Sequence, residues 1–417
     1  MTFTTRTLLA LAAVAPFASA LDVKDDDLKV GLKLQLQVRA EKGWSSGTDG
    51  NAYNVPEAVA NSESDAMDFY VRRARIGFNG TWKGDYKFAY LMRADYQDRS
   101  NAAAAPAGAP SALTQSRTPQ THVAYLERVI KQEEKGIEHS VRMGLDYAWF
   151  NGPSACFSST SALLVTDRAT IGMLAPRGVG VGYKMTHKMV TWGVDIQNNS
   201  GNGTTTGDLQ NVAGDGSADQ GEGLFIGTRV QVIAYDSEEK GHMKSIESFM
   251  GKPGKGLLVS AELGLNDDDN TGANTTVDTT GYGFEILGHM DAITVLAEYR
   301  QTIADTNSST ALDDKNVATA YLIQLGYALP MGDKVLEPAI RWTRLNADSD
   351  TNESANYGTA EYGASGYTWD LGVNYYLHGY SNKVALAYQH WQGENGGTAT
   401  VGDAKADTIR FQWGLAF

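Results

Sequence analysis

The sequence predicts an all-β fold, a transmembrane antiparallel β-barrel of about sixteen strands. Three observations support this prediction: short segments in which apolar and polar residues alternate, connectors of two contrasting lengths, and a last segment that ends in an aromatic residue, Phe417. A strand that faces lipid on one side and water on the other has this period of two. The connectors are rich in Gly, Asn and Asp, which suits turns and loops.

The last segment shows the alternation most clearly. One face carries the apolar residues Ile409, Phe411, Trp413, Leu415 and Phe417, and the residues between them are polar or small. Because successive side chains of a strand point to opposite faces, the first set suits lipid and the second suits water. The segment 367–378 divides in the same way.

Segments of this kind number about sixteen, and an even number is the rule for bacterial single-chain barrels. We expect strands near 29–40, 68–82, 85–97, 119–131, 138–147, 178–187, 188–197, 223–234, 256–266, 280–289, 291–302, 317–329, 333–346, 366–378, 381–393 and 405–417. A ring of this size leaves an aqueous channel.

The connectors support the same architecture, because a barrel in the outer membrane has short turns at one rim and long loops at the other. Tight turns are expected at 82–85, 329–333 and 378–381, and long polar loops at 43–67, 98–118, 198–222, 267–279, 303–316 and 347–365. A large secreted β-sandwich or β-helix also has short strands. Tyr and Trp at strand ends, beside apolar faces without charges, favour contact with lipid.

The first twenty residues have the three zones of a secretory signal peptide. Arg6 supplies the positive charge, 8–14 is apolar, and Ala18 and Ala20 are the small residues that signal peptidase requires. We expect cleavage after Ala20, which leaves 21–417 as one barrel domain in the outer membrane of a Gram-negative bacterium. The single cysteine, Cys156, excludes an intrachain disulfide.

Charge and motif content argue against several other functions. A net charge of −14 speaks against nucleic acid as a partner. The 7 histidines lack the spacing of metal ligands. Paired acids around Asp268 and at 313–314 lie among solvated loop residues, where a hydrolase would need an enclosed site. We therefore expect no catalytic residue, metal or cofactor, with a secreted or outer-membrane hydrolase as the alternative from another class.

Basic residues occupy positions that the two-residue alternation places on the inner face of the barrel. In the segment 69–82, the alternate residues that end at Trp82 are mostly apolar or small, which places Arg73 and Arg75 on the lumen face. By the same count Tyr70 is expected on the lipid face.

Arg72 breaks this alternation, and we expect it near the strand end, where a long side chain reaches the membrane interface. Further basic residues share the inward parity: Lys87, Arg93, Arg142, Arg229, Arg300, Arg341, Lys383 and Arg410. A ladder of guanidinium groups would bind passing anions weakly enough to release them, which makes Arg93 and Arg229 candidate anion-binding residues. Alternatively, the basic residues pair with acids of the same face, such as Asp95, Asp146, Glu298 and Glu337.

The connector 148–177 is too long for a turn and too apolar for an exposed loop. We expect it to fold into the barrel as a constriction loop that places Arg168, together with Asp167 and Arg177, at the narrowest point. The alternative is an extracellular loop that packs on its neighbours.

Four stretches of the chain resemble the phosphate-selective porin O and P family. They are FYVRRARIGFNGTWKGDYKFAY at 69–90, TDR…APRGVGVGYK at 166–184, AYLIQLGYALPMGDKVLEPAIRWTRLN at 320–346 and TWDLGVNYYLHGYSNKVALAYQHW at 368–391. The resemblance implies a sixteen-stranded, usually trimeric barrel in outer-membrane lipid and lipopolysaccharide, with an inward-folded loop after the fifth strand, that passes small anions such as phosphate.

The resemblance also implies roles for single residues. It makes Arg72, Arg73 and Arg75 pore-lining residues and brings Arg168 and Arg177 to the constriction. The sequence departs from the family after the fifth strand, where Asp146 replaces a basic residue. This departure leaves a non-selective or cation-tolerant general porin as the alternative.

Overall fold

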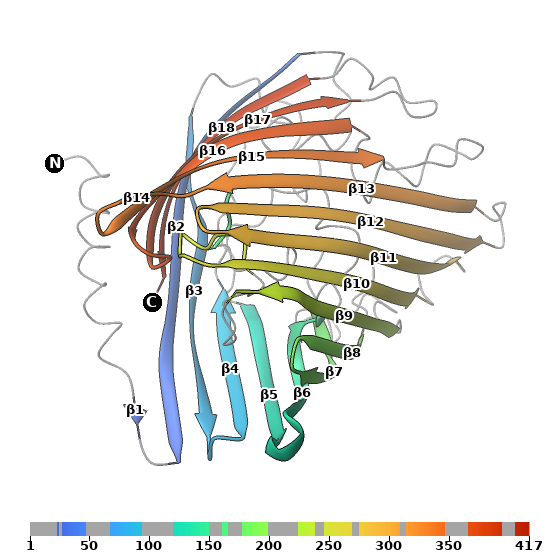
Figure 1. Cartoon of the computed structure of the whole chain (residues 1–417). Helices are drawn as coiled ribbons and strands as arrows, with labels where there is room; N and C mark the ends of the chain where they lie inside the picture. Colours follow the sequence, from blue (N-terminus) through green and yellow to red (C-terminus); the bar gives the residue numbers. More distant parts are fainter. Residues whose placement is uncertain are drawn as a thin grey trace.

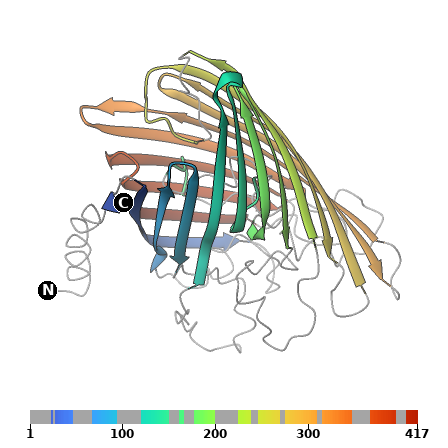
Figure 2. The same cartoon turned by 90° about the horizontal axis from the view of Figure 1, so that it is seen from below.

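The computed structural model describes residues 23–24, 27–46, 67–93, 120–149, 161–165, 177–198, 224–237, 246–268, 275–308, 314–346, 366–393 and 405–416. The strands among them form one closed antiparallel sheet in which each long strand pairs with the next in the chain. In Figures 1 and 2 the wall continues from the blue strands through green and yellow to the red ones, where β18 lies beside β2. The expected signal peptide at 1–20 and Phe417 lie outside the described residues.

The barrel has sixteen long strands, as the sequence predicted. They are β2 (Leu28–Ser46), β3 (Asp68–Trp82), β4 (Tyr86–Arg93), β5 (Gln120–Gln132), β6 (Ile137–Tyr147), β7 (Arg177–His187), β8 (Val190–Asn198), β9 (Leu224–Asp236), β10 (Lys255–Asp268), β11 (Thr275–Met290), β12 (Ile293–Ser308), β13 (Asp314–Tyr327), β15 (Lys334–Asn346), β16 (Gly366–His378), β17 (Asn382–Gly393) and β18 (Lys405–Ala416). Two short strands add to them: β1 (Val23–Lys24) pairs with β2, and β14 (Leu329–Met331) continues β13.

Closure of the ring follows from the pairing of β18 with β2 over the whole length of β18. The predicted alternation is confirmed on this strand and on β16. Leu371 and Phe411 are half exposed on the outer face, whereas Asp370 and Arg410 are buried on the inner face. A closed ring leaves no unpaired strand edge within the membrane.

The two ends of the barrel differ in the length of their connectors. One end, which we call the short-turn rim, has the connectors 83–85, 133–136, 188–189, 237–254, 291–292, 332–333 and 379–381. The other, the long-loop rim, has the connectors after β2, β4, β6 and β8 and their later counterparts. Gly84 has a φ of 73°, a left-handed conformation that glycine adopts without strain in such a turn. By the usual orientation, the short-turn rim faces the periplasm.

Aromatic side chains lie on the outer face toward both rims. The rings of Trp82 and Tyr86 are 5.4 Å apart near the short-turn rim, and those of Trp342 and Trp369 are 6.5 Å apart toward the other. Such rings suit the boundary between hydrocarbon and headgroups. Within the described residues, no helix is long and apolar enough to cross a membrane.

The expected lipid-facing position of Tyr70 is wrong, because β3 contains a β-bulge. The register of β2 and β3 passes from the pair Gln37 and Arg73 to the pair Val38 and Val71, so that Arg72 is the additional residue. A bulge changes the parity of all residues beyond it. Tyr70 therefore points inward, where its hydroxyl donates to Glu41 Oε2 at 3.1 Å, and Arg72 lies within the strand and not at its end.

Candidate functional site

The inner faces of β2, β3 and β4 form a basic wall. Their inward positions, counted between the bulge and the short-turn rim, include six basic residues: Lys29, Lys33, Arg73, Arg75, Lys87 and Arg93. In the described stretches 29–37, 73–81 and 87–93, no inward position holds an acid. Like charges on one face repel each other, so this composition lowers stability and indicates a function.

Three arginines of the basic wall lie close together. Arg75 is directly opposite Arg93 across the β3–β4 pairing, and Arg73 is two residues from Arg75 on the same face. On the other side of β3, Gln35 and Gln37 face these arginines and add neutral polar groups. The predicted residues Arg73, Arg75 and Arg93 are thus brought together, and Arg72 lies beside them in the bulge.

Lysines extend the basic wall to the short-turn rim. Lys29 and Lys87 both face Thr81, one from each side. Lys87 Nζ lies 3.7 Å from Glu127 Oε1 of β5, yet its side chain remains 46% exposed. Lys33 is also exposed. Exposed ammonium groups in a lumen can exchange water for an anion.

The inner face of β9–β16 has a different electrostatic character, because its arginines lie in buried ion pairs. The distances are 3.4 Å for Arg229 and Glu285, 3.1 Å for Arg300 and Glu262, and 2.8 Å for Arg341 and Asp370. The interpretation that inward bases pair with inward acids is therefore correct for this wall. Asp95 lies outside the described residues, and Glu337 accepts hydrogen bonds from hydroxyl groups.

Arg229 had been expected to bind anions, and the structure places it away from water. Its guanidinium donates to Ser260 Oγ at 2.8 Å and lies 5.5 Å from the ring centre of Trp149. Glu285 completes this environment. Arg229 as an anion-binding residue stays a prediction, and its contacts favour a role in holding the wall together.

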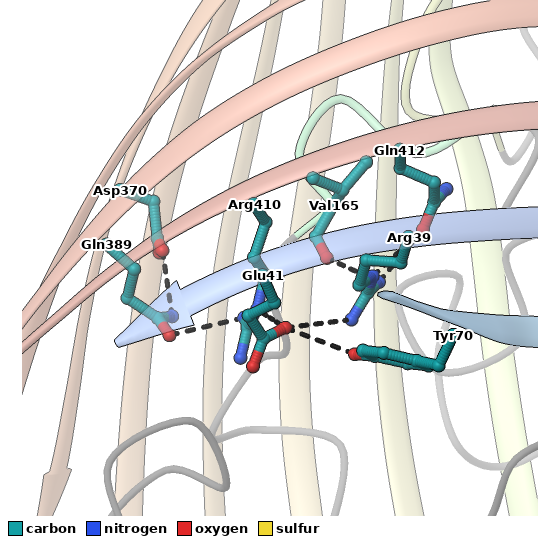
Figure 3. A network of polar contacts seen from close by, with 8 residues as sticks. All are labelled: Arg39, Glu41, Tyr70, Val165, Asp370, Gln389, Arg410 and Gln412. Atoms are coloured by element: carbon teal, nitrogen blue, oxygen red, sulfur yellow. Dashed lines mark hydrogen bonds and ion pairs between the residues drawn. The ribbon is translucent and has the colours of Figure 1, made fainter. Parts of the chain in front are cut away.

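A polar network crosses the seam between the last strand and the first (Figure 3). Arg410 Nε of β18 donates to Glu41 Oε2 of β2 at 2.7 Å, and its terminal nitrogen donates to Gln389 Oε1 at 3.3 Å. Arg39 of β2 donates in return to Gln412 of β18 at 2.9 Å. Charge-assisted hydrogen bonds are about twice as strong as neutral ones, so this network reinforces the closure of the ring.

The acid Asp146, which stands where the family resemblance leads one to expect a basic residue, has a structural explanation. Arg142 donates to Asp146 Oδ2 at 2.5 Å and to Asp195 Oδ1 at 3.1 Å. Asp195 Oδ2 in turn accepts from the backbone N–H of Trp149 at 2.6 Å. The two carboxylates therefore bind Arg142 and the start of the connector that follows β6.

Residues 161–165 belong to that connector and lie inside the barrel. Leu163, Leu164 and Val165 pack against inward alanines of β15 and β17. The carbonyl of Val165 accepts from Arg39 at 2.8 Å (Figure 3). Arg168 lies outside the described residues, as does the side chain of Arg177, which begins β7. Narrowing of the channel by this connector stays a prediction.

Sequence reasoning missed two parts of the inner face. It overlooked Lys29 and Lys33, although their spacing of four within an alternating segment places both on the face opposite the leucines of β2. It also overlooked the segment 246–250, which enters the barrel from the short-turn rim. Adjacent apolar residues in one strand, such as Leu257 and Leu258, could have indicated this segment, because one of the two must point inward and needs a cover.

Among the described residues, no cluster of His, Cys, Asp or Glu could hold a metal ion.

Several solved structures share this architecture. OmpT of Vibrio cholerae, an outer-membrane protein solved in a trimer form, matches with a TM-score of 0.55 and 12% identity, over 94% of this chain and 100% of that one. The anion-selective porin from Comamonas acidovorans gives 0.52 and 10%, over 94% and 100%. The outer-membrane channel DcaP of Acinetobacter baumannii gives 0.54 and 11%, over 95% and 99%. At these identities the likeness concerns the fold.

The sequence itself supplies the family. No curated protein sequence matches the chain. The family model for phosphate-selective porin O and P matches residues 48–417, which is most of the chain and nearly all of the barrel. The chain therefore belongs to the phosphate-selective porin O and P family and is an outer-membrane porin, a channel and not an enzyme.

Proposed function

We propose that this porin prefers anions, with phosphate among its permeating solutes, and that anions move along the basic wall of β2–β4. The observation that carries the proposal is the run of six inward basic residues, with no inward acid in the described stretches 29–37, 73–81 and 87–93. On the inner face of β9–β16, by contrast, Arg229, Arg300 and Arg341 each lie in a buried ion pair with a carboxylate of the wall. The sign of the exposed charge therefore favours anions.

The arrangement of the basic residues suits the passage of anions and not only their binding. Arg75 and Arg93 lie opposite each other, and Lys33 and Lys29 follow toward the short-turn rim. A conducting path needs several weak sites from which the ion can leave. Guanidinium groups bind phosphate oxygens through paired N–H donors, and ammonium groups act as compact point charges.

The second candidate, a non-selective or cation-tolerant general porin, rested on the acid at Asp146. The contact of Asp146 with Arg142 weakens that argument, because the carboxylate is engaged within the wall. The hydrolase alternative is set aside by the family assignment.

Three further properties belong to the proposal. The connector 148–177 narrows the channel and brings Arg168 and Arg177 to the constriction, in support of which residues 161–165 lie inside the barrel. The chain acts as a homotrimer in outer-membrane lipid and lipopolysaccharide, in support of which OmpT, whose fold is similar, was solved in a trimer form. Residues 1–20 direct export and are removed, as their composition indicates.

The proposal is tested by reversal potentials in planar bilayers for the native protein and for Arg75→Ala/Arg93→Ala. One unit charge attracts an anion at 4 Å by about 1 kcal/mol in a water-like dielectric, so each loss lowers anion permeability by up to about fivefold and thereby lowers the anion-to-cation permeability ratio. Arg128→Gln is the matched control, because Arg128 lies on the outer face over the ring of Tyr86 at 5.7 Å. Added phosphate should reduce chloride current in the native channel and less so in the double variant. Equal selectivity and equal phosphate block in both would refute the proposal.

A further inference from the structure

The connector 237–254 is much longer than the other connectors of the short-turn rim, and its last part lies inside the barrel. Glu247, Ser248 and Phe249 are at most 2% exposed. The connector returns to the rim at Gly254, whose carbonyl accepts from the N–H of Asp291 in the β11–β12 turn at 2.8 Å. We call residues 246–250 the rim insert.

Phe249 of the rim insert covers an apolar area of the inner wall. Four leucines, one on each of β10–β13, point inward beneath it: Leu258, Leu287, Leu296 and Leu322. The ring of Phe249 also stacks on His289 with a centroid distance of 3.9 Å. Leucines would be unfavourable on a wall that faces water, so this part of the wall is built to be covered.

The next part of the wall is shaped to receive residues 161–165. A Cβ on Gly372 would lie 2.5 Å from Leu164 Cδ2, and one on Gly326 would lie 2.8 Å from Leu163 Cδ2. The inward residues around these glycines include Ala339, Ala385 and Ala387, which pack on the same leucines. Small residues on β13–β17 thus provide the space that the inserted leucines fill.

Polar side chains of the wall hold the backbone of residues 161–165. Lys383 Nζ donates to the carbonyl of Ala162 at 2.7 Å, and Asn374 Nδ2 donates to the carbonyl of Leu163 at 2.6 Å. These bonds satisfy carbonyl groups that would otherwise be buried without partners.

The rim insert is held in a similar way. The carbonyl of Ser248 accepts from the hydroxyl of Tyr380. The side-chain hydroxyl of Ser248 donates to Glu337 Oε2 at 2.6 Å, and the same carboxylate oxygen accepts from the hydroxyl of Tyr376 at 2.7 Å. The insert is therefore fixed to β15, β16 and the β16–β17 turn.

Glu247 joins the two inserted segments. Its Oε2 accepts from the backbone N–H of Leu163 at 3.0 Å and from Gln324 Nε2 of β13 at 2.9 Å. One buried carboxylate oxygen therefore connects the rim insert, the segment from the opposite rim and the wall between them. Loss of such an acceptor leaves a buried N–H without a partner, which destabilises the arrangement.

We infer that Glu247 is a positioning residue that holds residues 161–165 and the rim insert together, so that they fill the lumen beside β10–β17 and leave the basic wall as the open path. The buried inner faces of β10–β17 and the exposed lysines of β2 and β4 agree with this division. The inference rests on the proposed function only where it names anions as the solutes on the open path.

Thiol accessibility tests the division of the lumen. In a Cys156→Ser background, Ala387→Cys introduces a thiol beneath Leu164, and Asn79→Cys introduces one on the open wall, where Asn79 is exposed. A small charged thiol reagent should react with the second thiol quickly and with the first very slowly. Equal reaction rates would overturn the claim that the lumen beside β17 is filled.

Glu247→Ala then tests the positioning role. We expect it to expose the thiol at position 387, leave the thiol at position 79 unchanged, raise single-channel conductance and weaken selectivity, because solutes gain a path beside a wall whose arginines are paired with acids. Continued protection of position 387 with unchanged conductance would overturn the role of Glu247. Heat-modifiable migration on a gel verifies that each variant forms a barrel.

A conservative variant keeps the test valid if Glu247→Ala does not assemble. Glu247→Gln retains an acceptor for the Leu163 N–H but presents an amide to Gln324, so we expect protection of position 387 between those of the native and alanine forms. Full exposure of position 387 in Glu247→Gln, which keeps that acceptor, would contradict a role exerted through the Leu163 N–H. These outcomes are separate from failure of the proposed function, which would appear as an absence of anion preference in the unmodified channel while position 387 stays protected.

Discussion

Arg341 of β15 and Asp370 of β16 are direct cross-strand neighbours, and the guanidinium Nε donates to Asp370 Oδ2 at 2.8 Å. Both side chains are at most 1% exposed. Gln389 Nε2 donates to the other carboxylate oxygen at 2.8 Å, and Gln389 also contacts Arg410. The pair therefore connects the inner wall of β15–β16 to the network that crosses the barrel seam.

Arg341→Met should lower the free energy of unfolding by about 3–5 kcal/mol, because it leaves the Asp370 carboxylate buried without its cation. The double variant Arg341→Met/Asp370→Leu should recover much of that loss, since it removes both charges. Denaturant unfolding of the refolded barrel in lipid measures both. A double variant no more stable than the single one would show that the pair is not the source of the loss.

Gly372→Leu should destabilise the barrel by about 1–3 kcal/mol, the usual range for an overfilled core. The added side chain would collide with Leu164 and approach the carbonyl of Leu386, which lies 3.1 Å from the ideal Cβ position. Gly288→Leu is the control, because a Cβ there meets nothing within 4 Å. The same unfolding measurement applies, and an equal effect of the two substitutions would contradict the packing of Leu164 on β16.

Lys29→Gln/Lys33→Gln should reduce the anion-to-cation permeability ratio without changing barrel stability, because both lysines are exposed on the inner face of β2. Lys83→Gln is the matched control, since Lys83 lies in the β3–β4 turn over the ring of Trp82 at 5.1 Å. Reversal potentials compare the three proteins. If the control changes selectivity as much as the double variant, the effect comes from the net charge of the protein and not from the lysines of the basic wall.

Anion preference should also weaken as salt rises. The Debye length falls from about 10 Å at 0.1 M to about 3 Å at 1 M, so exposed lysines and half-buried arginines lose much of their reach. Permeability ratios measured at both mean concentrations test this expectation. A ratio independent of salt would place the selectivity at a buried, dehydrated site and not along the basic wall.

Much of the fold could be predicted from the sequence because period two identifies both a strand and its two faces. The sixteen strands from β2 to β18 and the inward direction of Arg73, Arg75 and Arg410 follow from this pattern. The position of Tyr70 could not be predicted, because the bulge at Arg72 becomes visible only when the register with β2 is known.

The same alternation could not predict which residues the inward side chains contact. Parity assigns Arg229 and Arg341 to the lumen face, but the choice of Glu285 and Asp370 as partners depends on the stagger between strands. The rim insert was missed for a related reason. Its few residues carry no periodicity, and the inward Leu258 and Leu287 that require it lie on other strands.

The most direct test of the central claim is the reversal potential of the unmodified channel in a gradient of potassium chloride at low mean salt. From the basic wall we expect a reversal potential whose sign shows that chloride is more permeant than potassium. In Arg75→Ala/Arg93→Ala we expect this potential to shift toward zero. A potential of the opposite sign, or one near zero in the unmodified channel, would contradict an anion path along β2–β4.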